Sequence, residues 1–327
     1  MDLQIDMQKD KQKDMQKDRQ TDLQKDPGTD GQTGRPGLPQ PIPWVYADHR
    51  DVFRTVQDRG TPYLSFKALE ATGLVANGFS TRMGGASQGR SATMNFSYSR
   101  GDDPAHVLEN YTRMARALGV ERDQMVVSWQ THTTNVRLVT KEDAGKGVIR
   151  ERDYRDVDGL ICDIPGITLV TFYADCVPLY FLDRRKRAVG LSHSGWRGTV
   201  ARMGQATLKA MRDAFGTRPE DVTACVGPSI CGDCYEVGEE VAKAFHKGFS
   251  QADCSRFLRA GKKPGKYQLD LWKANELILQ EAGVLKENIT VTNICTRCNH
   301  PYLFSHRVCG EDRGNLAAFL GLRYSRI

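Results

Sequence analysis

Two nearly continuous apolar runs constrain the fold of this chain most strongly. They are "GITLVTFYADC" (166–176) and "RAVGLSHSG" (187–195), and neither alternates apolar with polar residues as a strand with one face in water would. Apolar runs of this length are typical of strands that are covered on both faces. Because covering both faces of a sheet requires further layers, these runs predict a layered α/β protein.

Other segments supply the remaining elements. Apolar stripes with helical spacing predict helices at 103–119, 198–216 and 270–283. Shorter apolar runs predict strands at 44–48, 62–66, 125–132, 157–163, 221–230 and 288–296. Strands and helices are mixed from residue 41 to residue 327 without a break in composition, so we expect a single α/β domain with mixed sheets over 41–327.

The first 40 residues differ from the rest of the chain. Residues 2–33 repeat a four-residue unit that begins with aspartate, as in "DMQKDKQKDMQK", and a stretch rich in proline and glycine follows. This segment has almost no apolar side chains to bury. Residues 1–40 are therefore predicted to form a disordered low-complexity tail and linker.

Composition excludes several classes of protein. The net charge is only +6 over 327 residues, without the clustered basic face that nucleic-acid binding requires. No apolar run approaches the roughly 20 residues of a membrane span, and the N-terminus has no hydrophobic signal region. We therefore expect a cytoplasmic protein with no nucleic-acid or membrane partner. Its nine cysteines would stay reduced, and in that setting cysteine more often serves metal binding or catalysis than disulfides.

Three predicted strands end in a side chain that can bind a metal ion. "SWQTH" ends in His132, "FYADC" in Cys176 and "GLSH" in His193. If these ends converge, two imidazoles and one thiolate form the ligand set of a catalytic zinc site with an open fourth position. The same residues also fit a cysteine hydrolase, in which His193 activates Cys176 and Asp175 or another carboxylate orients His193. Purely structural roles for all three side chains are the remaining alternative.

Two arginines are candidate anion contacts. Arg82 precedes the Gly84–Gly85 turn in "GFSTRMGGASQG", and Arg197 lies at the start of the helix that follows "SHSGW". Guanidinium groups and helix N-termini both attract phosphate or carboxylate groups. Each arginine could instead be the partner of a structural carboxylate.

Two further cysteine pairs have the spacing of zinc-binding half-sites. They are "CGDC" (Cys231 and Cys234) and "CTRC" (Cys295 and Cys298). Together they would make a four-cysteine zinc site, but about 60 residues separate the pairs, whereas ribbons and fingers use 15–20. This mismatch favours separate thiols that pack loops.

At these residues the sequence resembles a known family, the laccase-domain proteins of the YfiH/YlmD type. The motifs occur in the family's order: "GFSTRMGGAS", "GDDPAHVLEN", "QTHTTNV", "DGLICD", "ADCVPLYFLD", "SHSGWRG", "GPSICGDCYEV" and "CTRCNHPYLFSHR". They extend over about residues 44–322. Members of this family were long called multicopper polyphenol oxidases and are now described as zinc-dependent purine nucleoside phosphorylases.

The resemblance implies a fold, a cofactor and an activity. The fold would have four layers, α/β/β/α, with mixed sheets, and His132, Cys176 and His193 would bind one Zn²⁺. The chain would use phosphate to convert adenosine, inosine, guanosine or methylthioadenosine to a free base and a ribose 1-phosphate. It would also deaminate adenosine. Arg82 and Arg197 would contact the phosphate or the sugar.

The resemblance also carries alternatives and two departures. A family role in editing peptidoglycan precursors would make the chain an amidase, and the older family name would make it a polyphenol oxidase. Copper fits less well than zinc, because multicopper oxidases use about ten histidines and this chain has seven. Thr133 stands where many relatives have glycine, which is expected to narrow the pocket. Asn315 stands where a Gly-Arg pair is common. A non-enzymatic scaffold is the last alternative.

Overall fold

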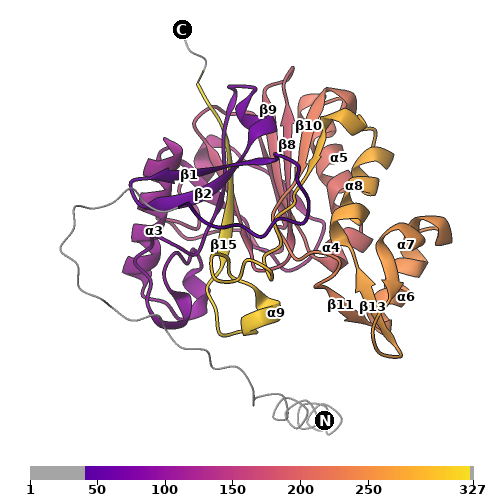
Figure 1. Cartoon of the computed structure of the whole chain (residues 1–327). Helices are drawn as coiled ribbons and strands as arrows, with labels where there is room; N and C mark the ends of the chain where they lie inside the picture. Colours follow the sequence, from indigo (N-terminus) through magenta and orange to yellow (C-terminus); the bar gives the residue numbers. More distant parts are fainter. Residues whose placement is uncertain (1–40, 325–327) are drawn as a thin grey trace, which may run out of the picture. The chain divides into compact units, whose positions relative to one another are not determined.

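Two six-stranded sheets dominate the structure, a computed structural model that describes residues 41–324 (Figure 1). The tail and linker predicted over residues 1–40 lie outside the described residues. In order across the first sheet, the strands are β1 (Phe53–Asp58), β2 (Thr61–Phe66), β3 (Val75–Ser80), β15 (Leu316–Leu322), β7 (Thr168–Tyr173) and β4 (Met125–Val127). Only β7 and β4 pair in parallel; the other neighbours are antiparallel.

The second sheet has parallel pairs at both edges. In order across it, the strands are β14 (Ile289–Val291), β10 (Val222–Val226), β8 (Val177–Asp183), β9 (Ala188–Ser194), β6 (Gly159–Cys162) and β5 (Val136–Leu138). β14 and β10 are parallel, as are β6 and β5, and the remaining pairs are antiparallel. Mixed sheets are thus confirmed.

Helices and a small third sheet complete the described residues. The third sheet contains β11 (Glu236–Gly238), β13 (Lys266–Leu269) and β12 (Leu258–Ala260). The α-helices are α2 (Lys67–Glu70), α3 (Pro104–Leu118), α4 (Trp196–Val200), α5 (Met203–Phe215), α6 (Glu239–Gly248), α7 (Gln251–Phe257), α8 (Leu271–Glu281) and α9 (His306–Cys309). Short 3₁₀ turns lie at 89–91, 98–100, 122–124, 141–143, 219–221 and 286–288. Within residues 41–324, no helix is both long enough and apolar enough to span a bilayer.

The large sheets stack face to face between two layers of helix. Side chains of both sheets, such as Leu169 and Tyr180, form one buried core between them. The outer face of the first sheet packs against α3, where Tyr111 and Met114 are fully buried. α5 and α8 cover the outer face of the second sheet (Figure 1). The four-layer α/β/β/α arrangement is therefore confirmed.

The predicted helix at 103–119 is confirmed together with its end signals. The Asp103 side chain accepts a hydrogen bond from the Ala105 N–H at 2.8 Å, and Pro104 occupies the first turn. Gly119 has a φ of 67°, the left-handed conformation in which helices commonly end.

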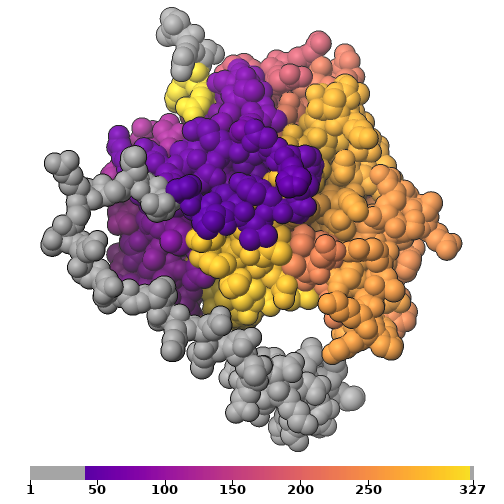
Figure 2. All heavy atoms as spheres, viewed as in Figure 1, coloured from indigo at the N-terminus to yellow at the C-terminus, as the bar shows by residue number. Residues whose placement is uncertain are grey.

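Two other predictions differ from the structure. The helix predicted at 198–216 is divided into α4 and α5, because Arg202 between them has a left-handed φ of 61°. The strand predicted at 44–48 is only an isolated bridge between Tyr46 and Ile294. This segment is held instead by the C-terminal part of the chain, where Asn299 bonds to the backbone of Val45. Figure 2 shows the indigo start of the described chain lying against the yellow C-terminal part.

A buried aspartate anchors the loop that follows β5. Asp143 is 1% exposed and accepts hydrogen bonds from Arg137 at 2.9 Å and Lys146 at 2.8 Å. Burial alone would raise the pKa of Asp143, but these two cations lower it to about 2. The folded state therefore binds this proton less tightly than the unfolded chain does, so the stabilisation is present above about pH 4 and is lost as the pH falls toward 2.

The variant Asp143→Asn tests this anchor. We expect it to lower the free energy of unfolding by about 3 kcal/mol at neutral pH, because it leaves two cations without their buried partner. It should also flatten the decline in stability between pH 4 and pH 2. Chemical denaturation across that pH range is the measurement. Asp153→Asn removes the 67% exposed partner of the same lysine and should change little; equal losses in both variants would contradict the anchor.

Candidate metal centre and its cavity

The structure brings the three predicted metal ligands together. His132 follows β4, Cys176 lies between β7 and β8, and His193 belongs to β9. Their ligand atoms all lie within 4.8 Å of one another. The antiparallel register of β8 and β9 brings Cys176 and His193 together, because it pairs Pro178 with His193 and so leaves Cys176 beside the histidine. The parallel pair β4 and β7 brings the His132 loop to the same end of the molecule.

Asp158 orients both histidines. One of its carboxylate oxygens accepts a hydrogen bond from Nδ1 of His193 at 2.8 Å and another from the backbone N–H of His132 at 3.1 Å. The second oxygen accepts from the backbone N–H groups of Thr131 and Thr133. Because Nδ1 of His193 is used in this way, Nε2 is left to bind a metal ion. Asp158 is thus a positioning residue for both ligands.

Asp175 was the carboxylate considered from the sequence for orienting His193, but its hydrogen-bond partners are different. It accepts hydrogen bonds from the hydroxyls of Thr296 at 2.6 Å and Ser305 at 3.0 Å, and from the backbone N–H of Arg307 at 2.6 Å. It therefore fixes the chain next to Cys176 rather than orienting His193.

The electrostatics of the centre favour a negatively charged sulfur. Burial alone would raise the pKa of Cys176, but the neighbouring His193 and His132 lower it to about 6. Burial alone would lower the pKa of His193, yet the charges of Cys176 and Asp158 raise it to about 9. A thiolate and a carboxylate buried together need positive charge beside them; a protonated His193 supplies it, and a bound metal cation would replace that proton.

The donor set fits a single zinc ion. Two imidazoles and one thiolate are ligands that zinc prefers, and three protein ligands leave the fourth tetrahedral position for a substrate. All three side chains also line one cavity of about 570 Å³, so that position would face the space where a substrate enters.

A glycine makes room for the ligands. A Cβ atom on Gly195 would lie 3.0 Å from Sγ of Cys176 and 3.1 Å from Cδ2 of His132. Gly195→Ala is therefore expected to displace both ligands and to weaken zinc binding about tenfold, as measured by competition with a chromogenic chelator. Gly198→Ala is the matched control, because its Cβ would meet nothing closer than 3.5 Å. Equal affinities in the two variants would show that the close approach does not matter.

The rest of the cavity is lined by cations and aromatic rings. Arg100, Arg152 and Arg313 line it together with four aromatic side chains, namely Tyr98, Trp129, Phe172 and Tyr173. Within residues 41–324, Arg152 and Arg313 form no ion pair, although Arg313 is only 7% exposed. The Arg152 guanidinium lies 4.3 Å above the ring of Trp129. Two cations without a carboxylate partner, beside flat apolar surfaces, suit a ligand that carries both an anion and a ring system.

The two predicted arginines do not reach this cavity. The Arg82 guanidinium donates to the carbonyl of Ala92 at 2.9 and 3.1 Å and lies 4.6 Å above the ring of Phe304. The side chain of Arg197 is exposed and lies over the ring of its neighbour Trp196. Neither is among the residues that line the cavity shared by His132, Cys176 and His193.

Comparison with known proteins identifies the family. The sequence model described as "Multi-copper polyphenol oxidoreductase laccase" matches residues 76–323. The chain belongs to this laccase family. The resemblance seen in the sequence motifs is thereby confirmed.

Relatives within the laccase family carry enzyme names. A Bacteroides thetaiotaomicron protein named purine nucleoside phosphorylase is 36% identical over 255 residues, which cover 77% of this chain and 93% of the relative. Adenosine deaminase RL5, from an unknown prokaryotic organism, is 36% identical over 215 residues, covering 65% of this chain and 81% of the relative. The crystal structure of YfiH from Bacillus licheniformis has a TM-score of 0.77 at 30% identity and covers 84% of this chain and all of that chain.

Several residues around this candidate centre were not predicted from the sequence. Arg152 lies in the charged run "RERDYRD", which resembles a solvated loop, and Arg313 lies in "GEDRGN" with no motif around it. Asp158 had a detectable signal, since it immediately precedes the apolar strand "GLIC". Thr133 does not line the cavity and so does not narrow it; its hydroxyl donates to Asp158 at 3.0 Å. Asn315 does line the cavity, and it accepts a hydrogen bond from Arg313.

Proposed function

We propose that this chain is a zinc-dependent purine nucleoside phosphorylase. One observation carries the proposal: the cluster of His132, Cys176 and His193 opens into the same cavity as two arginines that form no ion pair with any described residue. Phosphorolysis needs a bound oxyanion next to a nucleoside, and this cavity offers groups for both. The name of the Bacteroides thetaiotaomicron relative supports the same activity.

Different residues of the cavity bind the phosphate and the nucleoside. Arg152 and Arg313 hold phosphate through charge-assisted hydrogen bonds, and aromatic side chains such as Trp129 and Phe172 pack against the purine. In the reaction, a phosphate oxygen bonds to C1′ of the ribose while the bond from C1′ to the base nitrogen breaks. The base leaves with the bonding electron pair and takes up a proton. The products are a free base and a ribose 1-phosphate.

The metal ligands have a distinct role in this scheme. His132, Cys176 and His193 would hold the zinc ion, which would supply a Lewis acid beside the reacting groups. Asp158 would hold both ligands in place for the ion, because it bonds to Nδ1 of His193 and to the backbone N–H of the loop that carries His132. The protein thus supplies a fixed site near the sugar and phosphate.

Adenosine deamination is a second candidate activity, favoured by the similarity to adenosine deaminase RL5. In this reaction water replaces the exocyclic amino group of adenosine, and ammonia leaves. It consumes no phosphate, so it can be measured separately in the same protein.

A comparison of products with and without phosphate tests the proposed function. Protein of known zinc content, incubated with inosine and phosphate, should release hypoxanthine and ribose 1-phosphate, and omitting phosphate should stop the release. Base release that is independent of phosphate, or no release, would contradict phosphorolysis. An editing amidase would instead release an amino acid from a cell-wall precursor, and a polyphenol oxidase would consume oxygen.

The phosphate contact can be tested at Arg152. Arg152→Gln should raise the KM for phosphate about 30-fold, because it removes a charge-assisted contact worth about 2 kcal/mol. Arg150→Gln is the matched control, since Arg150 is exposed, carries the same charge and does not line the cavity. If both variants change the KM equally, the effect reflects the overall charge of the protein, and the assignment of Arg152 is wrong.

A further inference from the structure

The four cysteines expected to pack loops separately lie together in the structure. Cys231 and Cys234 follow β10, and Cys295 and Cys298 follow β14. β10 and β14 are adjacent parallel strands, so the loops that follow them leave the sheet at the same end. A parallel bridge between Ser229 and Cys295 continues this pairing beyond the strands. The long separation in sequence is therefore no obstacle to convergence.

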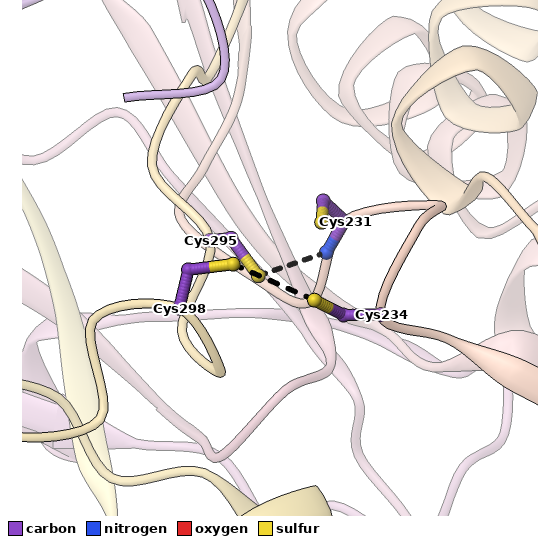
Figure 3. A group of neighbouring side chains, drawn as sticks. All are labelled: Cys231, Cys234, Cys295 and Cys298. Carbon is purple, nitrogen blue, oxygen red and sulfur yellow. Dashed lines mark hydrogen bonds between the residues drawn. The ribbon is translucent and has the colours of Figure 1, made fainter. Parts of the chain in front are cut away.

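The geometry of the four sulfur atoms matches one metal ion. All four Sγ atoms lie within 4.8 Å of one another, and those of Cys234 and Cys298 are 3.5 Å apart (Figure 3). One tetrahedral zinc ion with Zn–S bonds of about 2.3 Å separates its sulfur ligands by about 3.8 Å. A cluster of several iron atoms would spread its thiolate ligands over different metal atoms and so hold them farther apart.

Neighbouring donors are arranged to stabilise thiolates. The backbone N–H of Cys231 donates to Sγ of Cys295 at 3.3 Å, and Nη1 of Arg297 donates to Sγ of Cys234 at 3.4 Å. All nine cysteines of the chain lie in the described part and are free, so these four are available as ligands. Within each pair, two residues separate the cysteines, the spacing used by metal-binding knuckles.

We propose that Cys231, Cys234, Cys295 and Cys298 bind one structural zinc ion, separate from the ion assigned to His132, Cys176 and His193. Four protein ligands fill the tetrahedron, so this ion has no position for a substrate and serves the fold. Its binding replaces the protons of four thiols, so up to four protons are released for each zinc ion bound.

The proposed ion would brace the loop that carries Cys176. The residue before Cys231, Ile230, donates its N–H to the carbonyl of Asp175 at 3.0 Å. The residue after Cys295, Thr296, donates its hydroxyl to the Asp175 carboxylate. Asp175 has a left-handed φ of 86° and directly precedes Cys176. A cross-link between the two cysteine loops therefore fixes both sides of a strained residue next to a ligand of the candidate centre.

Metal counting in purified protein tests the proposal. The variants are Cys298→Ser, which alters an exposed side chain, and Cys254→Ala, a control cysteine on α7 outside both clusters. After equilibration with zinc under reducing conditions, Cys298→Ser should hold one zinc ion fewer per chain than the wild type, and Cys254→Ala should match the wild type. Equal zinc contents in Cys298→Ser and wild type would overturn the proposal.

The same zinc measurement in a Cys176→Ala protein separates zinc at the four-cysteine site from zinc at the candidate catalytic centre. In Cys176→Ala the four-cysteine site is intact, so one zinc ion should remain, and the double variant with Cys298→Ser should lose it. This loss is expected whether or not the chain is a phosphorylase. A zinc-free Cys176→Ala protein would overturn the proposal.

Cobalt(II) spectroscopy of a protein that keeps all four cysteines tests the proposal even if Cys298→Ser fails to fold. Cobalt(II) loaded into Cys176→Ala should show the intense thiolate-to-metal absorption of a tetrahedral four-sulfur site. Absence of that absorption would contradict the proposal. An intact mass that is lower by paired hydrogens and restored by reductant would show disulfides in place of the metal.

Discussion

Replacing Cys176 with alanine should empty the candidate catalytic centre and lower phosphorolysis of inosine by about a thousandfold or more. Cys176 is the one anionic ligand among the three, and its pKa of about 6 keeps it ionised at neutral pH. Losing it costs the site both a ligand and its compensating charge, and the several kcal/mol that a Lewis acid contributes are lost with the ion. The measurements are zinc content and steady-state rates of the purified variant.

The control and the possible outcomes separate the chemical roles of Cys176. Cys254→Ala should retain zinc at both sites and keep its activity, because Cys254 lies on α7 away from the cavity. Full activity in Cys176→Ala would place the chemistry elsewhere in the protein. Loss of activity with zinc still bound at the centre would instead favour a nucleophilic cysteine. In that case alkylation of Cys176 should also be rapid in the zinc-loaded wild type.

Asp158→Asn should produce the second large effect, a loss of zinc affinity of about 10- to 100-fold at the candidate centre. One carboxylate oxygen of Asp158 accepts hydrogen bonds from His193 Nδ1 and the backbone N–H of His132. The other accepts from the backbone N–H groups of Thr131 and Thr133. An asparagine has only one acceptor oxygen. Whichever way its amide turns, the NH₂ group faces a backbone N–H, so the loop that carries His132 loses a bond.

The same substitution also disturbs the imidazole. If the NH₂ group faces His193, Nδ1 must accept a hydrogen bond, which moves the ring proton to Nε2, the atom left for the metal. Zinc titration of the variant should show the loss of affinity. Asp156→Asn, two residues away on the exposed side of the same loop, should bind zinc like the wild type. Similar losses in both variants would indicate a general effect of charge.

The candidate metal ligands could be predicted because of where they stand in the sequence. His132, Cys176 and His193 each end an apolar run, and polar side chains at strand ends are recognisable without a structure. The layered fold followed from the same runs, since strands without polar faces need cover on both sides. Motifs of the family supplied the number and order of the layers.

The predictions that differ from the structure depend on contacts between distant residues. The separate packing predicted for the cysteine pairs was wrong, because the parallel pairing of β10 and β14 is not visible in the sequence. Arg152 and Arg313, two of the three arginines that line the cavity, resemble surface charges until the fold shows that neither has an ion pair within residues 41–324. Arg202 ends α4 in a left-handed conformation without the glycine that usually marks such a position.

The order of the ligands along the chain has a practical consequence. Cys176 directly precedes the first strand of the β8–β9 hairpin and His193 lies on the second, and the turn between them covers residues 184–187. Cutting the polypeptide at that turn would leave His132 and Cys176 on one fragment and His193 on the other. Neither fragment could then bind the ion with all three ligands, so recovery of zinc binding on mixing would report that the two halves of the protein have reassembled.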